Sequence, residues 1–261
     1  MPSDRARAVR PSLARRIGGG LLLLGLLPVA CGGADSDGNT VTPDPCADPA
    51  KAPATCLTPK QPPEHYVQQS LLYFDTLDVS APKAKPAYAE LAARWEWPPW
   101  LKLTGYGAQM LLDTAELVTK SDPSTVPTRE CRAFAVQPFG RCHVTMAYAG
   151  GPCAIYEEFT FNDQGEITFI EAWTDAPGRL PMDGAADRWA EGPAVRRLST
   201  RVPGLGSSTG RIDPDGAAMK AAAAADPDVA DFAERARDFW GAWFAEVKAN
   251  GKDIYARGCG W

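Results

Sequence analysis

Alternating apolar and polar positions are clearest between residues 153 and 175, which read CAIYEEFTFNDQGEITFIEAWTD. Two runs rich in aromatic and β-branched residues flank the turn sequence Asn162-Asp163-Gln164-Gly165, and this pattern predicts a β-hairpin. If residues 161 and 167 pair across the turn, one face of the hairpin is apolar and aromatic and the other is mostly polar. The apolar face then comprises Ile155, Glu157, Phe159, Phe161, Ile167, Phe169, Glu171 and Trp173. Two glutamates are therefore predicted to face each other on an aromatic surface.

Apolar residues at helical spacing predict further elements on both sides of the hairpin. Three helices are predicted before it, at residues 64–79, 86–96 and 108–120. Asp226 is a good N-cap with Pro227 in the first helical position, so a long last helix is predicted to begin there and to end near Gly251. We interpret residues 186–213, which are rich in Gly, Pro and Arg, as a long surface loop.

The predicted strands complete the order of elements. A short strand is expected at Trp100-Leu101-Lys102-Leu103, and four longer ones at 129–137, 141–148, 153–161 and 166–175. The order is therefore helix, helix, short strand, helix and a four-stranded meander. This order, the hairpin FTFNDQGEITFIEAW and the glycine that opens the third helix together resemble the NTF2-like or SnoaL-like superfamily.

The resemblance covers about residues 64–175 and implies an α+β fold. In that fold a curved antiparallel sheet wraps around the N-terminal helices to form a cone with an open pocket. Residues 176–261 have no place in the minimal fold, and we interpret them as a loop and a C-terminal helical extension. The extension is expected to pack on the domain, because the apolar face of its predicted helix must be buried.

The first 30 residues have the pattern of a signal peptide. Five arginines precede the apolar run from Ile17 to Ala30, which is too short to span a bilayer comfortably. The run ends directly before Cys31, which resembles a bacterial lipoprotein signal and implies lipidation of Cys31 by fatty acids such as palmitate. An ordinary secretory signal and a twin-arginine signal at Arg15-Arg16 are the alternatives. We expect an exported protein, anchored to the membrane of the cell envelope, with residues 31–63 as a tether.

The net charge of the chain limits its possible partners, and its cysteine content indicates disulfides. The first 30 residues hold five of the 27 basic and one of the 32 acidic residues, so the remaining chain has a net charge of about −9. This acidity disfavours nucleic-acid binding, which needs a basic face. An even number of cysteines follows Cys31, which favours disulfides in an exported chain. The candidates are Cys46, Cys56, Cys131, Cys142, Cys153 and Cys259.

A metal site is the alternative to disulfides for part of this set. It would use Cys131, Cys142, His143 and Cys153, whose spacings match no C-x₂-C knuckle. We therefore expect no metal and no cofactor.

The two glutamates of the hairpin are the candidate catalytic residues. Two close carboxylates in an apolar site push at least one pKa upward, which suits a general base. The SnoaL-like resemblance implies an acidic residue in the cone that removes a proton next to a carbonyl. Glu171, on the last strand, is the candidate for this role, with Glu157 as its partner. The alternatives are a register shift that turns them outward and pairing with arginines such as Arg132 or Arg141.

Aromatic residues are the candidates for a ligand pocket, although ordinary core packing is the alternative for each. The predicted pocket residues are Tyr73, Trp100, Phe159, Phe169 and Trp173. The leading hypothesis is a non-catalytic surface protein that binds a small apolar or aromatic ligand, or a partner protein. The others are an isomerase, cyclase or hydratase with Glu171 as general base, and a structural envelope protein with a filled cone. The same fold hosts enzymes and binders, and the sequence leaves monomer and homodimer open.

Overall fold

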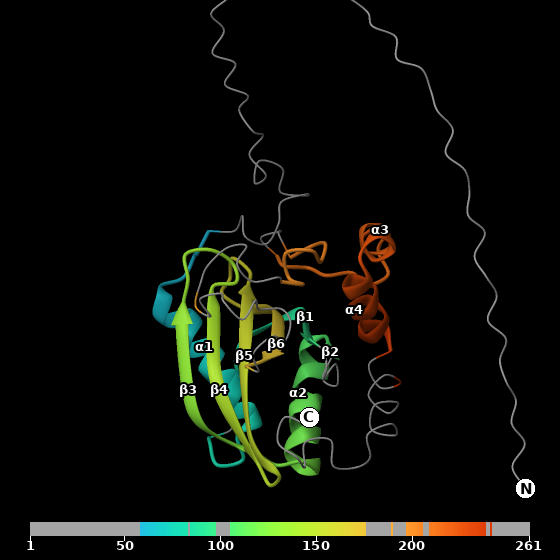
Figure 1. Cartoon of the computed structure of the whole chain (residues 1–261). Helices are drawn as coiled ribbons and strands as arrows, with labels where there is room; N and C mark the ends of the chain where they lie inside the picture. The colour runs from blue at the N-terminus through green and yellow to red at the C-terminus, as the bar shows by residue number, and fades with distance from the viewer. Residues whose placement is uncertain are drawn as a thin grey trace, which may run out of the picture. The chain divides into compact units, whose positions relative to one another are not determined.

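A computed structural model describes residues 58–82, 84–97, 105–175, 189, 197–205, 209–238 and 241. The elements in chain order are α1 (Pro63–Leu77), β1 (Tyr88–Glu96), β2 (Gly105–Tyr106), α2 (Ala108–Ser121), β3 (Thr125–Ala133), β4 (Gly140–Tyr148), β5 (Gly151–Phe161), β6 (Ile167–Thr174), α3 (Ala217–Ala225) and α4 (Pro227–Arg237). The strands form one sheet in the order β2-β1-β6-β5-β4-β3 (Figure 1). The predicted α+β class is confirmed. The sheet is mixed and not purely antiparallel, because β1 runs parallel to β6.

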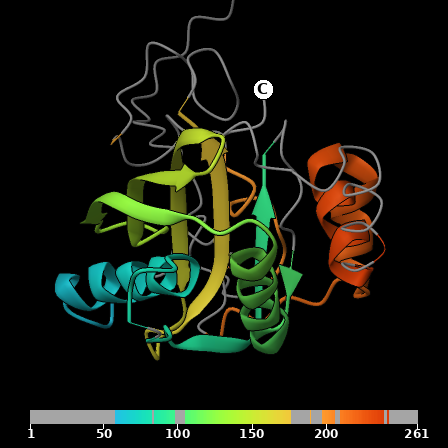
Figure 2. The ribbon, with the colours of Figure 1, turned by 90° about the horizontal axis from the view of Figure 1, so that it is seen from below.

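Each face of this sheet is covered by its own layer. Helices α1 and α2 pack on one face, which we call the cone face, and Figure 2 shows them along the same side of the sheet. The apolar core between them includes Tyr66, Phe74, Val118, Phe159 and Ile170. The opposite face, called here the outer face, is covered by residues 197–205 together with α3 and α4. Its separate core includes Trp95, Phe169, Trp173, Leu198 and Phe232.

The two helices of the cone face lie where the sequence predicted them. Helix α1 begins with Pro63 in the first helical position, where the missing N–H costs no hydrogen bond. It buries Tyr66, Ser70, Tyr73, Phe74 and Leu77, which recur at helical spacing on one face. Helix α2 follows Gly107, whose φ of 95° is in the region that favours glycine. Because α1 and α2 also contact each other, they form a continuous layer.

The predicted helix at residues 86–96 is wrong, because this segment is strand β1. Its end, Arg94-Trp95-Glu96-Trp97, alternates between charged and aromatic residues, which is the period of a strand. Both sets of side chains are buried, the charged ones on the cone face and the tryptophans on the outer face. The short strand predicted at Trp100 to Leu103 lies outside the described residues.

The β5–β6 hairpin forms around the predicted turn, but its register differs from the expected one. Phe161 pairs with Ile167, whereas Thr160 pairs with Phe169, so Thr168 is an extra residue in β6. This is a β-bulge, and it moves every later pair by one residue. Glu158 therefore lies opposite Glu171.

From Arg197 onward the described part of the C-terminal extension leads through α3 to α4. Asp226 caps α4 by accepting hydrogen bonds from the backbone N–H groups of Asp228 and Val229, as the sequence predicted. The helix ends at Arg237, which is earlier than the expected end near Gly251, and residues 239–240 and 242–261 lie outside the described residues. Helix α3 was not predicted and falls after the expected surface loop.

The extension crosses the sheet closely at the bulge. Gly210 has a φ of 60°, and a Cβ atom there would lie 2.2 Å from the Cγ2 methyl of Thr168. Only glycine fits this crossing without displacement of Thr168.

The prediction of disulfides is confirmed for the candidate cysteines that the structure describes. Cys131 and Cys142 form a disulfide that joins β3 to β4, which argues against the alternative metal site. Cys153 is also disulfide-bonded, to a cysteine outside the described residues. Cys46, Cys56 and Cys259 lie outside the described residues as well. Within the described part of the chain, no helix has the length and apolar character needed to cross a membrane.

Asp78 ties the end of α1 to β3. Its carboxylate accepts hydrogen bonds from the N–H groups of Ser80 at 2.8 Å and Val126 at 3.0 Å, and pairs with Arg129 at 2.7 Å. Burial acts to raise the pKa of Asp78, but these donors outweigh it and lower the pKa from 3.8 to about 2.

Replacing this carboxylate destabilises the fold. The difference between 3.8 and about 2 corresponds to about 2 kcal/mol, so we expect Asp78→Ala to lower the free energy of unfolding at pH 7 by at least this amount. This contribution is present above pH 3.8 and is lost as the pH falls through about 2. Urea unfolding at pH 7 measures it. Asp75→Ala, which removes a partner of Arg129 alone, is the matched control and should cost less. Equal losses for both variants would contradict the assignment.

Candidate functional site

A buried arginine joins two glutamates and a tyrosine on the cone face. Arg94 of β1 lies 2.7 Å from Glu96 Oε1 and 3.1 Å from Glu157 Oε1 of β5. The Nε atom of Arg94 donates a hydrogen bond of 2.8 Å to the hydroxyl of Tyr73 on α1. None of these four residues is more than 5 % exposed. We call them the cone cluster.

The cone cluster holds one positive and two negative groups when both glutamates are ionised. Burial raises the pKa of Glu157, the charge of Arg94 opposes this effect, and the charge of Glu96 adds to it. The second carboxylate oxygen of Glu157, Oε2, is buried and accepts no hydrogen bond within the described part of the chain. An ionised Glu157 is therefore poorly compensated, and the folded protein favours its protonated form more than solvent does.

Two arginines and a glutamate form a second buried group on the outer face. Glu158 accepts hydrogen bonds from Arg141 Nε at 2.7 Å and from Arg197 Nε at 2.6 Å. All three residues are at most 3 % exposed. Arg197 is the first residue of the described segment 197–205 of the extension, so its ion pair with Glu158 holds the extension to the sheet.

Glu171 reinforces the same attachment. It accepts hydrogen bonds from the backbone N–H groups of Leu198 at 2.6 Å and Ser199 at 3.0 Å, and from the indole N–H of Trp97 at 2.6 Å. Burial and the charge of Glu158 raise the pKa of Glu171, and these three donors oppose the rise. We call Glu158, Glu171, Arg141 and Arg197 the anchor cluster.

The predicted pairing of Glu157 with Glu171 inside the cone is therefore wrong. The bulge at Thr168 places Glu157 opposite Ala172 and turns Glu171 to the outer face. Each alternative holds for one glutamate: the register shift turns Glu171 outward, and Glu157 pairs with an arginine, which is Arg94. Arg141 pairs with Glu158 and Arg132 with Glu130. A general base at Glu171 would first have to release its N–H donors, and it would act outside the cone.

The predicted pocket residues are divided by the same bulge. Tyr73 and Phe159 lie in the core of the cone face, whereas Phe169 and Trp173 lie in the core of the outer face. All four are at most 4 % exposed, so they pack as core residues on opposite sides of one sheet. Trp100 lies outside the described residues.

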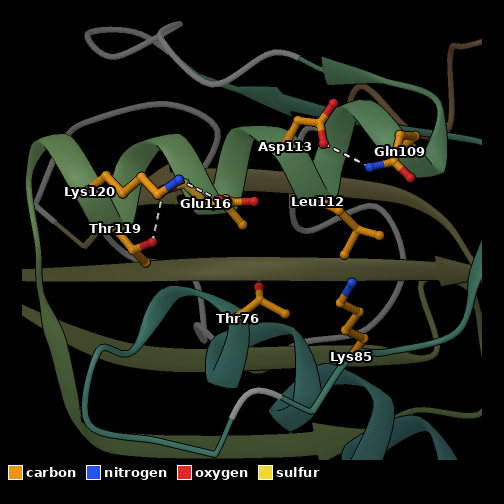
Figure 3. A pocket seen from close by; sticks show the side chains of 9 residues that line it. Thr76, Lys85, Gln109, Leu112, Asp113, Glu116, Thr119 and Lys120 are labelled. Atoms are coloured by element: carbon orange, nitrogen blue, oxygen red, sulfur yellow. Dashed lines mark hydrogen bonds and ion pairs between the residues drawn. The ribbon is translucent and has the colours of Figure 1, made fainter.

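An open groove lies between α1 and α2. Its volume is about 400 Å³, within the usual range of ligand pockets. The lining residues are Thr76, Lys85, Gln109, Leu112, Asp113, Ala115, Glu116, Thr119 and Lys120. Figure 3 shows Thr76 of α1 and Leu112 of α2 directed into the space between the helices. No member of the cone cluster lines this groove, so the buried charges and the open space are separate features.

The sequence contains a signal for the buried charges of β1 but none that is specific for the groove. The alternation of Arg94-Trp95-Glu96-Trp97 indicates a strand with Arg94 and Glu96 on the same face, in conflict with the helix predicted at residues 86–96. The groove residues of α2 recur every three or four positions, but such a stripe is typical of any solvent-facing helix side. Among the described residues, no group of three or more His, Cys, Asp and Glu could hold a metal ion.

Several solved structures are similar to part of this chain at low identity and low TM-score. A SnoaL-like family protein from Agrobacterium tumefaciens is 12% identical, with 43% of this chain and 99% of that chain covered and a TM-score of 0.32. A ketosteroid-isomerase-type protein from Kribbella flavida is 16% identical, with 51% and 96% covered and a TM-score of 0.34. A de novo designed protein with a curved β-sheet is 13% identical, with 44% and 88% covered and a TM-score of 0.33.

These scores and identities are too low to bear on function. No protein-family model and no curated protein sequence matches the chain. The described helices and strands form an α+β fold with one mixed sheet, followed by the C-terminal extension.

The raised pKa of Glu157 predicts a pH-dependent stability. A carboxyl with a raised pKa in the folded state costs stability as the pH rises above its ordinary value of 4.5. Glutamine does not ionise, so Glu157→Gln should gain stability relative to the wild type as the pH rises above 4.5, until the folded-state carboxyl itself ionises. The gain has a slope of up to about 1.4 kcal/mol per pH unit. Urea unfolding at several pH values measures it. Glu130→Gln, at an exposed position of β3, is the control, and parallel curves for wild type and Glu157→Gln would refute the idea.

Proposed function

We propose that this chain is an exported, lipid-anchored protein that binds a small apolar ligand, without converting it, in the groove between α1 and α2. The observation that carries this proposal is the separation of the open groove from the cone cluster. General acid–base catalysis is best served by a group whose pKa is shifted toward neutrality, and Glu157, which has such a shift, lies in the cone cluster, which is at most 5 % exposed and absent from the groove lining. The ionisable residues of the lining, Lys85, Asp113, Glu116 and Lys120, lie on a solvent-accessible wall. Binding needs only a shaped apolar surface with access from solvent.

The groove offers such a surface. Leu112 and the buried Ala115 supply aliphatic groups from α2, and Thr76 and Thr119 add their methyl groups. The aliphatic stems of Lys85 and Lys120 extend this surface while their ammonium groups stay near solvent. Apolar area removed from water contributes about 25 cal/mol per Å², so a ligand that covers these groups gains affinity in proportion to its apolar area.

The lipid anchor in this proposal is supported by the first 31 residues of the sequence. Basic residues, a short apolar run and a cysteine directly after Ala30 are the features that a lipoprotein signal requires. A lipid on Cys31 and the tether at residues 31–63 would hold the folded part beside a membrane, where apolar molecules are plentiful.

Proton transfer by Glu157 is the second candidate function. It is favoured by the unpartnered Oε2 atom and the raised pKa of Glu157, which together suit a group that exchanges a proton. This function requires the cone to open, because Glu157 is fully buried.

Binding in the groove should depend on Leu112. The probe is N-phenyl-1-naphthylamine, a neutral apolar dye whose fluorescence increases in apolar sites. We expect the full chain to bind this dye and Leu112→Gln to weaken binding about tenfold, since a buried leucine side chain contributes about 1.5–3 kcal/mol. Leu117→Gln is the matched control, because Leu117 is a half-buried residue of the same helix outside the groove lining. Equal dye binding by Leu112→Gln and the wild type would contradict the site.

Membrane attachment should depend on Cys31. We expect the wild-type protein in the membrane fraction of bacterial cells that express it, and Cys31→Ser largely in the soluble fraction, because lipid chains supply the membrane affinity. Labelling with an alkyne analogue of palmitate should mark the wild type only. Cys46→Ser is the control and should remain labelled. Equal labelling of wild type and Cys31→Ser would exclude Cys31 as the attachment point.

A further inference from the structure

Lys85 is the one charged side chain of the groove wall that has no partner within the described part of the chain. It precedes β1 and is solvent-exposed. Figure 3 shows its ammonium group directed across the groove toward Leu112 of α2. It makes no hydrogen bond or ion pair with a described residue, whereas the other ionisable residues of the wall each have a partner.

Those other groups are engaged within α2 itself. Lys120 pairs with Glu116 one turn earlier, and Gln109 donates its amide hydrogen bond to Asp113 at 2.7 Å. Figure 3 shows Asp113 on the side of α2 that points away from Lys85. The hydrogen bond and charge of Lys120 lower the pKa of Glu116, and the charge of Lys85 adds to this effect. Lys85 therefore lies near Glu116, whose negative charge Lys120 already balances.

An ammonium group that forms no described ion pair and lies next to an apolar wall defines a ligand class. The remaining carboxylate of the wall, Asp113, lies on the side of α2 away from Lys85 (Figure 3). A ligand with an apolar chain covers Leu112 and Ala115, and a negative end group lies against the Lys85 ammonium. Lysine acts as a compact point charge and does not impose the planar geometry that arginine does, so it accepts a single anionic group of varied shape. A positive end group would meet the same ammonium and be repelled.

We propose that the groove between α1 and α2 selects small amphiphiles with one anionic end group, and that the ammonium group of Lys85 binds this anionic group. This inference rests on the proposed function, because it concerns the same groove. The expected preference is modest, since an ion pair near solvent contributes at most about 1 kcal/mol, which corresponds to about fivefold in affinity.

The experiment compares three probes of equal chain length. Octanoate, 1-octanol and octylamine are titrated below their micelle concentrations into the full chain carrying Cys31→Ser, which keeps the protein free of detergent. We expect octanoate to bind about fivefold more tightly than 1-octanol, and octylamine to bind least. Lys85→Met keeps the apolar stem and should reduce octanoate affinity to that of 1-octanol while leaving 1-octanol unchanged. Lys85→Glu should reverse the order of octanoate and octylamine.

A matched lysine separates local from general charge effects. Lys220 is exposed on α3, outside the groove, and Lys220→Met should change no affinity. Equal binding of all three probes, or an unchanged octanoate preference in Lys85→Met, would overturn the role of Lys85 while leaving the groove as a binding site. If no probe binds, or if Leu112→Gln weakens none of them, the groove itself fails and the proposed function fails with it.

Discussion

Thr168 occupies a bulge that shifts the β5–β6 pairing by one residue, and this shift decides which face of the sheet Glu171 occupies and which glutamate lies opposite it. In a strand, successive side chains point to opposite faces, so one extra residue exchanges the faces of all residues beyond it. Glu171 consequently meets the backbone of the extension on the outer face, whereas Glu157 stays on the cone face with Arg94. The β5–β6 pair thus carries Glu157, whose ionised form is poorly compensated, on the cone face and Glu171, which accepts several hydrogen bonds, on the outer face.

The two clusters differ in charge balance. The anchor cluster has two arginines and two glutamates, and N–H donors of the extension complete its hydrogen bonding. The cone cluster has one arginine between two glutamates, and one carboxylate oxygen of Glu157 has no donor among the described residues. Buried ion pairs repay the loss of hydration only when their geometry and hydrogen bonds are complete. The anchor cluster meets this condition and fixes the extension, whereas the cone cluster meets it only when Glu157 carries a proton.

Local patterns in the sequence predicted the local elements well. The turn at Asn162 to Gly165, the N-cap at Asp226 and helices α1 and α2 depend on nearby residues, and all appear in the structure. The candidate site was predicted less well, because it depends on pairing between strands. Nothing in the run around Thr168 indicates an extra residue, and Gly210, which packs closely against it, is distant in the sequence. Strand β1 could have been predicted in place of a helix, since Arg94-Trp95-Glu96-Trp97 alternates clearly. The groove arises from the spacing of two helices, which no single segment encodes.

The close contact of Gly210 with Thr168 links two parts of the chain that differ in role. Thr168 sets which side chains face the cone, and Gly210 sets where the extension passes over the sheet. A side chain at position 210 has space only if position 168 becomes smaller or the bulge disappears. Loss of the bulge would in turn bring Glu171 to the cone face, opposite Glu157. Descendants of this chain are therefore expected to vary at positions 168 and 210 together, so that the two positions evolve as a pair.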